Sequence, residues 1–164
     1  MNHLPALPIL IPLFAASIAL FFEHRRFGMV PQRIVAWTSI AAMLAVTCML
    51  VGSAASGEVS VYLLGDWPAR LGIVLMVDRL SALMLMVGLL LGAACLLHAC
   101  AGWDRRAPHF HAFFQFQLMG LNGAFLTGDL FNLYVWFEVM LMASFVLVSL
   151  GGERAQLQGA LKYV

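Results

Sequence analysis

Residues 130–150 read LFNLYVWFEVMLMASFVLVSL, a mainly apolar stretch in which Glu138 is the one charged side chain. A helix rises about 1.5 Å per residue, so a stretch of this length crosses the roughly 30 Å hydrocarbon core of a bilayer. Inside lipid, only helices and closed barrels satisfy the backbone hydrogen bonds. The stretch therefore predicts a transmembrane helix.

Four further apolar runs precede it at the spacing expected of consecutive membrane spans. They cover residues 4–22, 34–52, 80–97 and 110–128. The sequence thus predicts an all-α, polytopic integral membrane protein with about five transmembrane helices and a single transmembrane domain over residues 1–164. Asp78 and Asp129 stand at the starts of predicted helices, where a carboxylate is a favoured cap.

The longest connection between the spans covers residues 53–78. It holds two β-prone segments, VSVYLL and GIVLMV, separated by turn formers. Such a pattern is typical of two short strands joined by a turn. We therefore expect a small hairpin there.

The composition excludes other classes of protein. Hydrophobic residues make up 63% of the 164 residues and charged residues 10%, far from the balance of a soluble domain. A formal net charge of +1 gives no basic surface for nucleic acid. A cleaved signal peptide is the alternative for residues 4–22, but that run has no basic segment before it and contains Pro5, Pro8 and Pro12.

Basic residues set the expected orientation. Seven of the nine Lys and Arg fall in connections that alternate onto one side of the membrane, and only Arg70 and Arg79 fall on the other. Cytoplasmic connections carry the excess of basic residues. We therefore expect the N-terminus and the 53–78 loop outside and the C-terminus inside. The seven residues are Arg25, Arg26, Arg33, Arg105, Arg106, Arg154 and Lys162.

Glu138 is the most informative residue of the chain. It lies about 13 Å into its predicted helix, near the middle of the bilayer, where insertion of an acidic residue costs roughly 2.5–3.5 kcal/mol. Ionisable residues at such depth typically serve ion or proton pathways. The sequence contains a single lysine, Lys162, beyond the inner end of this helix, so no ion pair at mid-membrane is available within the chain. Glu138 is the predicted proton-pathway residue; a neutral glutamic acid bonded to a neighbouring helix is the alternative.

Several polar side chains could support that carboxyl group. Polar groups in membrane helices hold water or hydrogen-bond to neighbouring helices, and both roles stay open for them. No metal site is expected. His98, His109 and His111 map to the inner ends of two predicted helices, and the rings of the last two, two residues apart on a helix, point apart. The candidate supporting residues are Gln117, Asn122, Asp129, Asn132 and Tyr134.

Two segments carry a resemblance to a known family. Residues 62–85, YLLGDWPARLGIVLMVDRLSALML, and residues 109–147, which include TGDLFNLYVWFE, resemble antiporter-like membrane subunits. With the ending GALKYV, they are most similar to the D-type subunit of the Mrp-type multisubunit sodium/proton antiporters. The same superfamily includes the membrane subunits of respiratory complex I and of membrane-bound hydrogenases.

The resemblance implies a function and a set of partners. Glu138 matches the family's essential glutamate, and the chain resembles the N-terminal fragment of a longer subunit, truncated after the fifth helix. It implies a secondary transporter subunit rather than an enzyme, with Na⁺ and H⁺ as transported ions, other antiporter subunits and membrane lipid as partners, no cofactor, and a bacterial plasma membrane as its place. Two alternatives remain: a proton-translocating subunit of an NADH–quinone oxidoreductase or hydrogenase complex, and a structural membrane protein without transport of its own.

Overall fold

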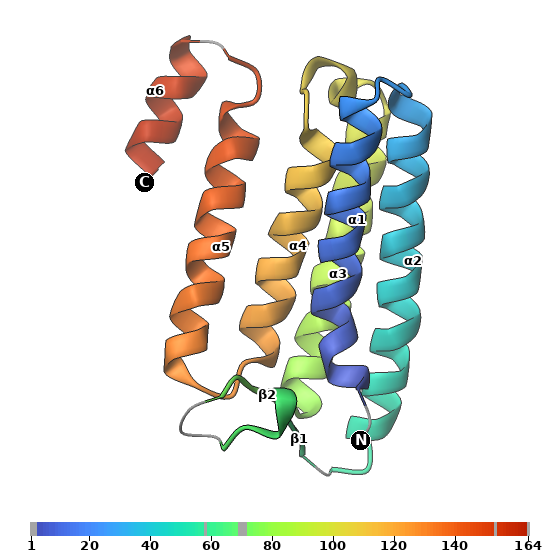
Figure 1. Ribbon diagram of the computed structural model, residues 1–164, viewed down its shortest axis with the longest axis vertical. Helices are drawn as coiled ribbons and strands as arrows, with labels where there is room; N and C mark the ends of the chain where they lie inside the picture. Colours follow the sequence, from blue (N-terminus) through green and yellow to red (C-terminus); the bar gives the residue numbers. More distant parts are fainter. Residues whose placement is uncertain (1–2, 58, 69–71, 153, 164) are drawn as a thin grey trace.

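The computed structural model describes residues 3–57, 59–68, 72–152 and 154–163 as a bundle of long helices (Figure 1). Four segments are long and apolar enough to cross a membrane: Leu4–His24, Met29–Ala54, Arg79–Cys100 and Leu130–Ser149. The protein is therefore an all-α integral membrane protein, as predicted. The remaining long helix of the bundle, α4 (Phe110–Leu126), has 17 residues.

Three helices precede α4 and pack with it. A short 3₁₀ turn (Leu4–Ala6) leads into α1 (Leu7–His24), which lies against both α2 (Met29–Ala54) and α4. The next helix, α3 (Arg79–Cys100), packs on α2 and α4. Helix α2 begins five residues before the expected Ile34, because Gly28 takes φ +87° and turns the chain directly into a helix. Arg33 consequently lies inside a helix rather than in a connection.

Prolines shape α1 without breaking it. Pro8 stands in its first turn, where its missing N–H is not needed, whereas Pro12 lies inside the helix. Because Pro12 has no N–H, the carbonyl of Pro8 receives no helical hydrogen bond from it. The side-chain amide of Asn122 on α4 donates to that carbonyl instead, at 2.8 Å. One polar residue of α4 thereby satisfies a backbone group of α1 and holds the two helices together.

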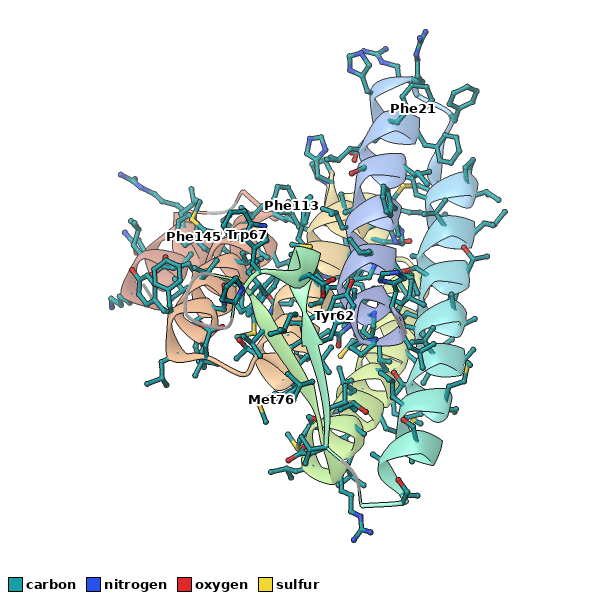
Figure 2. All side chains as sticks on the ribbon, turned by 60° about the horizontal axis from the view of Figure 1, so that its bottom comes forward. Phe21, Tyr62, Trp67, Met76, Phe113 and Phe145 are labelled. Carbon is teal, nitrogen blue, oxygen red and sulfur yellow. The ribbon has the colours of Figure 1, made fainter. Side chains whose placement is uncertain are left out.

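The connection before α3 forms the predicted hairpin. Strands β1 (Ser60–Leu63) and β2 (Val74–Val77) pair antiparallel, with Ser60 opposite Val77 and Leu63 opposite Val74. Figure 2 shows the hairpin, marked by Tyr62 and Met76, across one end of the bundle, with Phe21 at the opposite end. The hairpin is tied to the α4–α5 turn, because the Gly128 N–H donates to the Val74 carbonyl at 2.8 Å. We refer to this end as the hairpin end and to the opposite end as the loop end.

Helices α5 (Leu130–Ser149) and α6 (Arg154–Tyr163) stand to one side of the other four (Figure 1). Helix α5 packs closely on α4 through two glycines: a Cβ on Gly120 would lie 2.7 Å from Met140, and a Cβ on Gly123 would collide with the Trp136 ring. The sequence did not lead us to expect α6, since residues 151–163 have no long apolar run. It packs back along α5.

Candidate functional site

Helix α5 starts at an aspartate that caps it. The Asp129 carboxylate accepts a hydrogen bond from the Asn132 N–H at 2.8 Å and a second, short one from the Asn132 side-chain amide. Burial alone would raise the pKa of this carboxyl group, but the hydrogen bonds outweigh it, and the pKa lies below its ordinary value. The predicted supporting residues Asp129 and Asn132 thus pair with each other at the helix start.

Glu138 lies two turns further along α5, about 12 Å beyond Leu130 along the helix axis. It lines a groove of about 440 Å³ between α4 and α5. Every other residue along that groove is apolar, with Phe113, Phe116 and Met119 contributed by α4. Within the described part of the chain, Glu138 takes part in no ion pair. A carboxyl group in these surroundings is accommodated when it holds a proton or meets a cation from another element.

Tyr134 is the predicted supporting residue that lies next to Glu138. Its phenol stands one helical turn before the carboxyl group and is close enough to interact with it. Both side chains are exposed in this chain, as is most of α5, on which only Asn132 and Ala143 are buried. The face of α5 that bears Glu138 is therefore largely exposed and not covered by another described helix of this chain.

Asn122 and Gln117 occupy other positions on α4. The Asn122 amide group donates to Pro8 and, at 3.4 Å, to the sulfur of Met43, so it faces α1 and α2. Its Oδ1 atom is buried and has no partner among the described residues. Gln117 is half-buried, and its Oε1 likewise has no partner among them. Neither residue lines the groove around Glu138, so a role for either in supporting that carboxyl group stays a prediction.

A second cluster of charged groups, which sequence reasoning missed, lies inside the loop end. Arg33 of α2 donates two hydrogen bonds to the Asp104 carboxylate, at 2.7 and 2.8 Å. The Asp104 side chain is completely buried, and the ring of His111, also buried, stands 3.2 Å from the same carboxylate. The bidentate Arg33 guanidinium holds the pKa of the Asp104 carboxyl below its ordinary value. One sequence feature could have indicated this cluster: Asp104 is an acidic residue in a connection that otherwise carries the basic residues Arg105 and Arg106.

The neighbouring histidine turns the other way. His109 precedes the first residue of α4 and has a left-handed backbone conformation (φ +63°). It pairs with Glu23 of α1 instead, with 2.9 Å between its Nδ1 and the carboxylate. These contacts tie α1, α2 and α4 together at the loop end. Among the described residues, no group of three His, Cys, Asp or Glu side chains is placed to hold a metal ion.

Comparison with known proteins places these features in context. No protein-family profile matches the chain. All of the chain aligns with the D-type Na⁺/H⁺ antiporter subunit of Alkalihalophilus pseudofirmus at 42% identity and with that of Bacillus subtilis at 36%, and it covers 33% of each relative. A probable D-type K⁺/H⁺ antiporter subunit of Rhizobium meliloti is 41% identical over the whole chain, which covers 31% of it.

Solved structures agree with the sequence comparison. The chain superposes on a chain of the Mrp complex from Dietzia sp. with a TM-score of 0.86 and 28% identity, covering 99% of this chain and 31% of that one. A chain of an archaeal membrane-bound sulfane sulfur reductase, a respiratory membrane complex, shares the fold at a TM-score of 0.84 and 21% identity, with 99% and 33% covered.

The fold, a bundle of long apolar helices, is shared with membrane-embedded chains of these two complexes. Over its whole length the chain is similar to the D-type subunits of Na⁺/H⁺ antiporters and to a chain of the Mrp complex. It spans about a third of the length of the curated relatives it matches.

Proposed function

We propose that this chain forms part of a monovalent cation/proton antiporter subunit in which Glu138 carries protons. The observation that supports it is the position of Glu138, a carboxyl group halfway along a membrane helix in an otherwise apolar groove. Such a group changes its proton occupancy when a cation approaches or leaves, which is the property a proton pathway needs. Na⁺ is the proposed cation, and the relatives named for Na⁺ and for K⁺ make the ion a point to test.

The proposed setting is a bacterial plasma membrane, with the hairpin end outside and the loop end inside. Four arginines lie in the α1–α2 and α3–α4 connections at the loop end, which the positive-inside rule assigns to the cytoplasm. Of the two arginines expected on the opposite side, Arg79 starts α3 at the hairpin end, and Arg70 lies outside the described residues. The four loop-end residues are Arg25, Arg26, Arg105 and Arg106.

The proposed partners are the other subunits of a multisubunit antiporter. The open face of α5 around Glu138 and Tyr134 is consistent with further protein covering it. An ionisable side chain at membrane depth is normally directed toward protein or a water-filled cavity rather than lipid. We therefore expect partner helices to lie against this face in the assembled antiporter.

A redox-driven proton translocator is the second candidate. The likeness to a chain of the sulfane sulfur reductase favours it only at the level of the fold. Both candidates use Glu138 in the same way and differ in what drives the protons. Co-purification of the subunit with small antiporter subunits supports the first candidate, and co-purification with an iron–sulfur arm supports the second.

The decisive variant is Glu138→Gln in the assembled antiporter. Glutamine keeps the shape and hydrogen-bonding capacity of the side chain but cannot release a proton. We expect cation-dependent proton exchange in inverted membrane vesicles to fall to background, while the complex assembles normally. Exchange at the normal rate in an intact complex would refute the role of Glu138.

The matched control is Glu23→Gln, the same substitution at the loop end. Glu23 accepts a hydrogen bond from the His109 N–H and lies outside the α4–α5 groove. We expect this variant to keep its exchange activity. If both glutamine variants lose activity together with assembly, the loss reflects folding. Tyr134→Phe then tests the surroundings of Glu138 by a milder change.

A further inference from the structure

A second groove, separate from the one at Glu138, opens on the other side of α4. It has a volume of about 480 Å³ and lies between α3 and α4. Its walls are apolar and extend about 11 Å along α3, from Leu91 to His98. The groove ends at the loop end, where His98 and the indole of Trp103 line it. Apolar walls at membrane depth and a polar, aromatic end at the surface are the surroundings of a lipid tail and its head group.

Basic side chains follow directly at the end of the groove. Arg105 and Arg106 share a single turn of 3₁₀ helix (Trp103–Arg106) with the lining residue Trp103, and both are exposed. Within the described ranges neither arginine forms an ion pair. With His98, they make up what we call the loop-end basic cluster.

The acids around this loop do not neutralise the cluster. Asp104 stands between Trp103 and Arg105 in the chain, but its side chain is fully buried and takes both of its short hydrogen bonds from Arg33. Glu23 is taken up by His109. Because these two carboxylates are engaged by Arg33 and His109, the charges of Arg105 and Arg106 remain available to an anion at the surface.

We propose that the α3–α4 groove and the loop-end basic cluster bind an anionic phospholipid. One acyl chain would lie along Leu91, Cys95, Phe110 and Phe114, and the phosphate would meet Arg105, Arg106 and His98. Basic pockets between membrane helices bind anionic head groups through charge, while the apolar groove holds the tail. This inference rests on the membrane setting of the chain and not on the transport role of Glu138.

The hairpin end of the same helix pair offers an internal comparison. A groove of about 280 Å³ there is lined by Asp78, Met76 and Thr127, among others. Its titratable lining group is an acid, which repels a phosphate. The two grooves share α3 and α4 and differ in charge, so the charge predicts which of them takes an anionic lipid.

The test measures lipid binding by native mass spectrometry of the full subunit released from nanodiscs of phosphatidylglycerol and phosphatidylcholine. We expect one phosphatidylglycerol to be retained after mild delipidation. Replacing both arginines, Arg105→Gln with Arg106→Gln, should weaken its binding about 30-fold, the effect of two basic residues at a membrane surface. The matched control, Arg25→Gln with Arg26→Gln, removes the same charge from the same end of the molecule and should leave retention unchanged.

A second pair of variants tests the groove itself without altering charge. Ala94 lines the groove and is exposed, so Ala94→Phe should fill it and release the lipid, whereas Ala45→Phe, on an exposed position of α2, should not. Equal loss in both arginine double variants would mean binding to the general surface charge and would overturn the proposal. Retention in Ala94→Phe, or retention of phosphatidylcholine as strongly as phosphatidylglycerol, would also overturn it.

Discussion

Removal of Arg33 should destabilise the protein strongly, because it leaves a buried carboxylate without its cation. Arg33 donates hydrogen bonds of 2.7 and 2.8 Å to Asp104, whose side chain is fully buried. Breaking a buried pair by removing one partner costs about 3–5 kcal/mol. Arg33 is itself about a quarter exposed, and His111 stays beside Asp104. We therefore expect Arg33→Met to lower the free energy of unfolding by about 3 kcal/mol, the lower end of that range.

The assay is equilibrium unfolding of the purified subunit in detergent, with a double-mutant cycle. Asp104→Asn combined with Arg33→Met should recover most of the loss, because no charge then remains buried. Arg26→Met, which removes a solvated arginine from the same end, serves as the control. Loss of stability in Arg33→Met no larger than in Arg26→Met, or no recovery in the double variant, would refute the reasoning.

The same pair has a defined pH dependence. Arg33 lowers the pKa of Asp104 in the folded protein, so the carboxylate stabilises the fold fully above its unfolded pKa, about 3.9. That contribution is lost as pH falls below about 4 toward the lower folded pKa. The difference in stability between the natural protein and Arg33→Met should therefore be largest near neutral pH and shrink on acidification.

Two further predictions concern helix ends and helix packing. Asp78 and Ser81 form a reciprocal capping box at the start of α3, so Asp78→Ala should cost about 1 kcal/mol in an unfolding measurement, with Ser56→Ala as a neutral control. Because hydrogen bonds from Ser81 lower the Asp78 pKa, this contribution should shrink as the pH falls below about 4. An unchanged midpoint at neutral pH would contradict the cap. Gly123→Leu should separate α5 from α4, since even a Cβ at Gly123 collides with Trp136. Gly52→Leu is the control, because a Cβ at Gly52 meets nothing within 4 Å. Protease sensitivity of the α4–α5 turn reports the difference, and equal protection of both variants would contradict it.

Much of the fold was predictable because membrane helices are recognisable in a sequence as long apolar runs. The helical membrane architecture, the hairpin within residues 59–77 and the capping roles of Asp78 and Asp129 agree with the structure. The early start of α2 and the existence of α6 were missed, because both depend on short or polar segments in which periodicity is weak. The membrane orientation and the role of Glu138 remain predictions.

The site shows the same division. Glu138 could be singled out because one carboxylate in an apolar run is visible in the sequence itself. Its neighbours could not be assigned from spacing, because a helix position does not reveal which of several helices it will face. Asn122, expected to support Glu138, faces α1 and α2, while Arg33, taken as a topological charge, reaches Asp104 across 71 positions of the chain.

The amino-acid sequence alone determined that this protein is helical, that it spans a membrane and that Glu138 stands midway along an apolar helix. These three features follow from the solvation of each residue along one segment. Only the tertiary structure decided which polar groups meet: Arg33 and His111 with Asp104, and Asn122 with Pro8. It also placed Glu138 in an otherwise apolar groove. Those pairings depend on which helices pack together and at what rotation. The packing partners and the rotation of each helix are set by side-chain volumes on several helices at once. Gly123, for example, leaves the space that the Trp136 ring occupies.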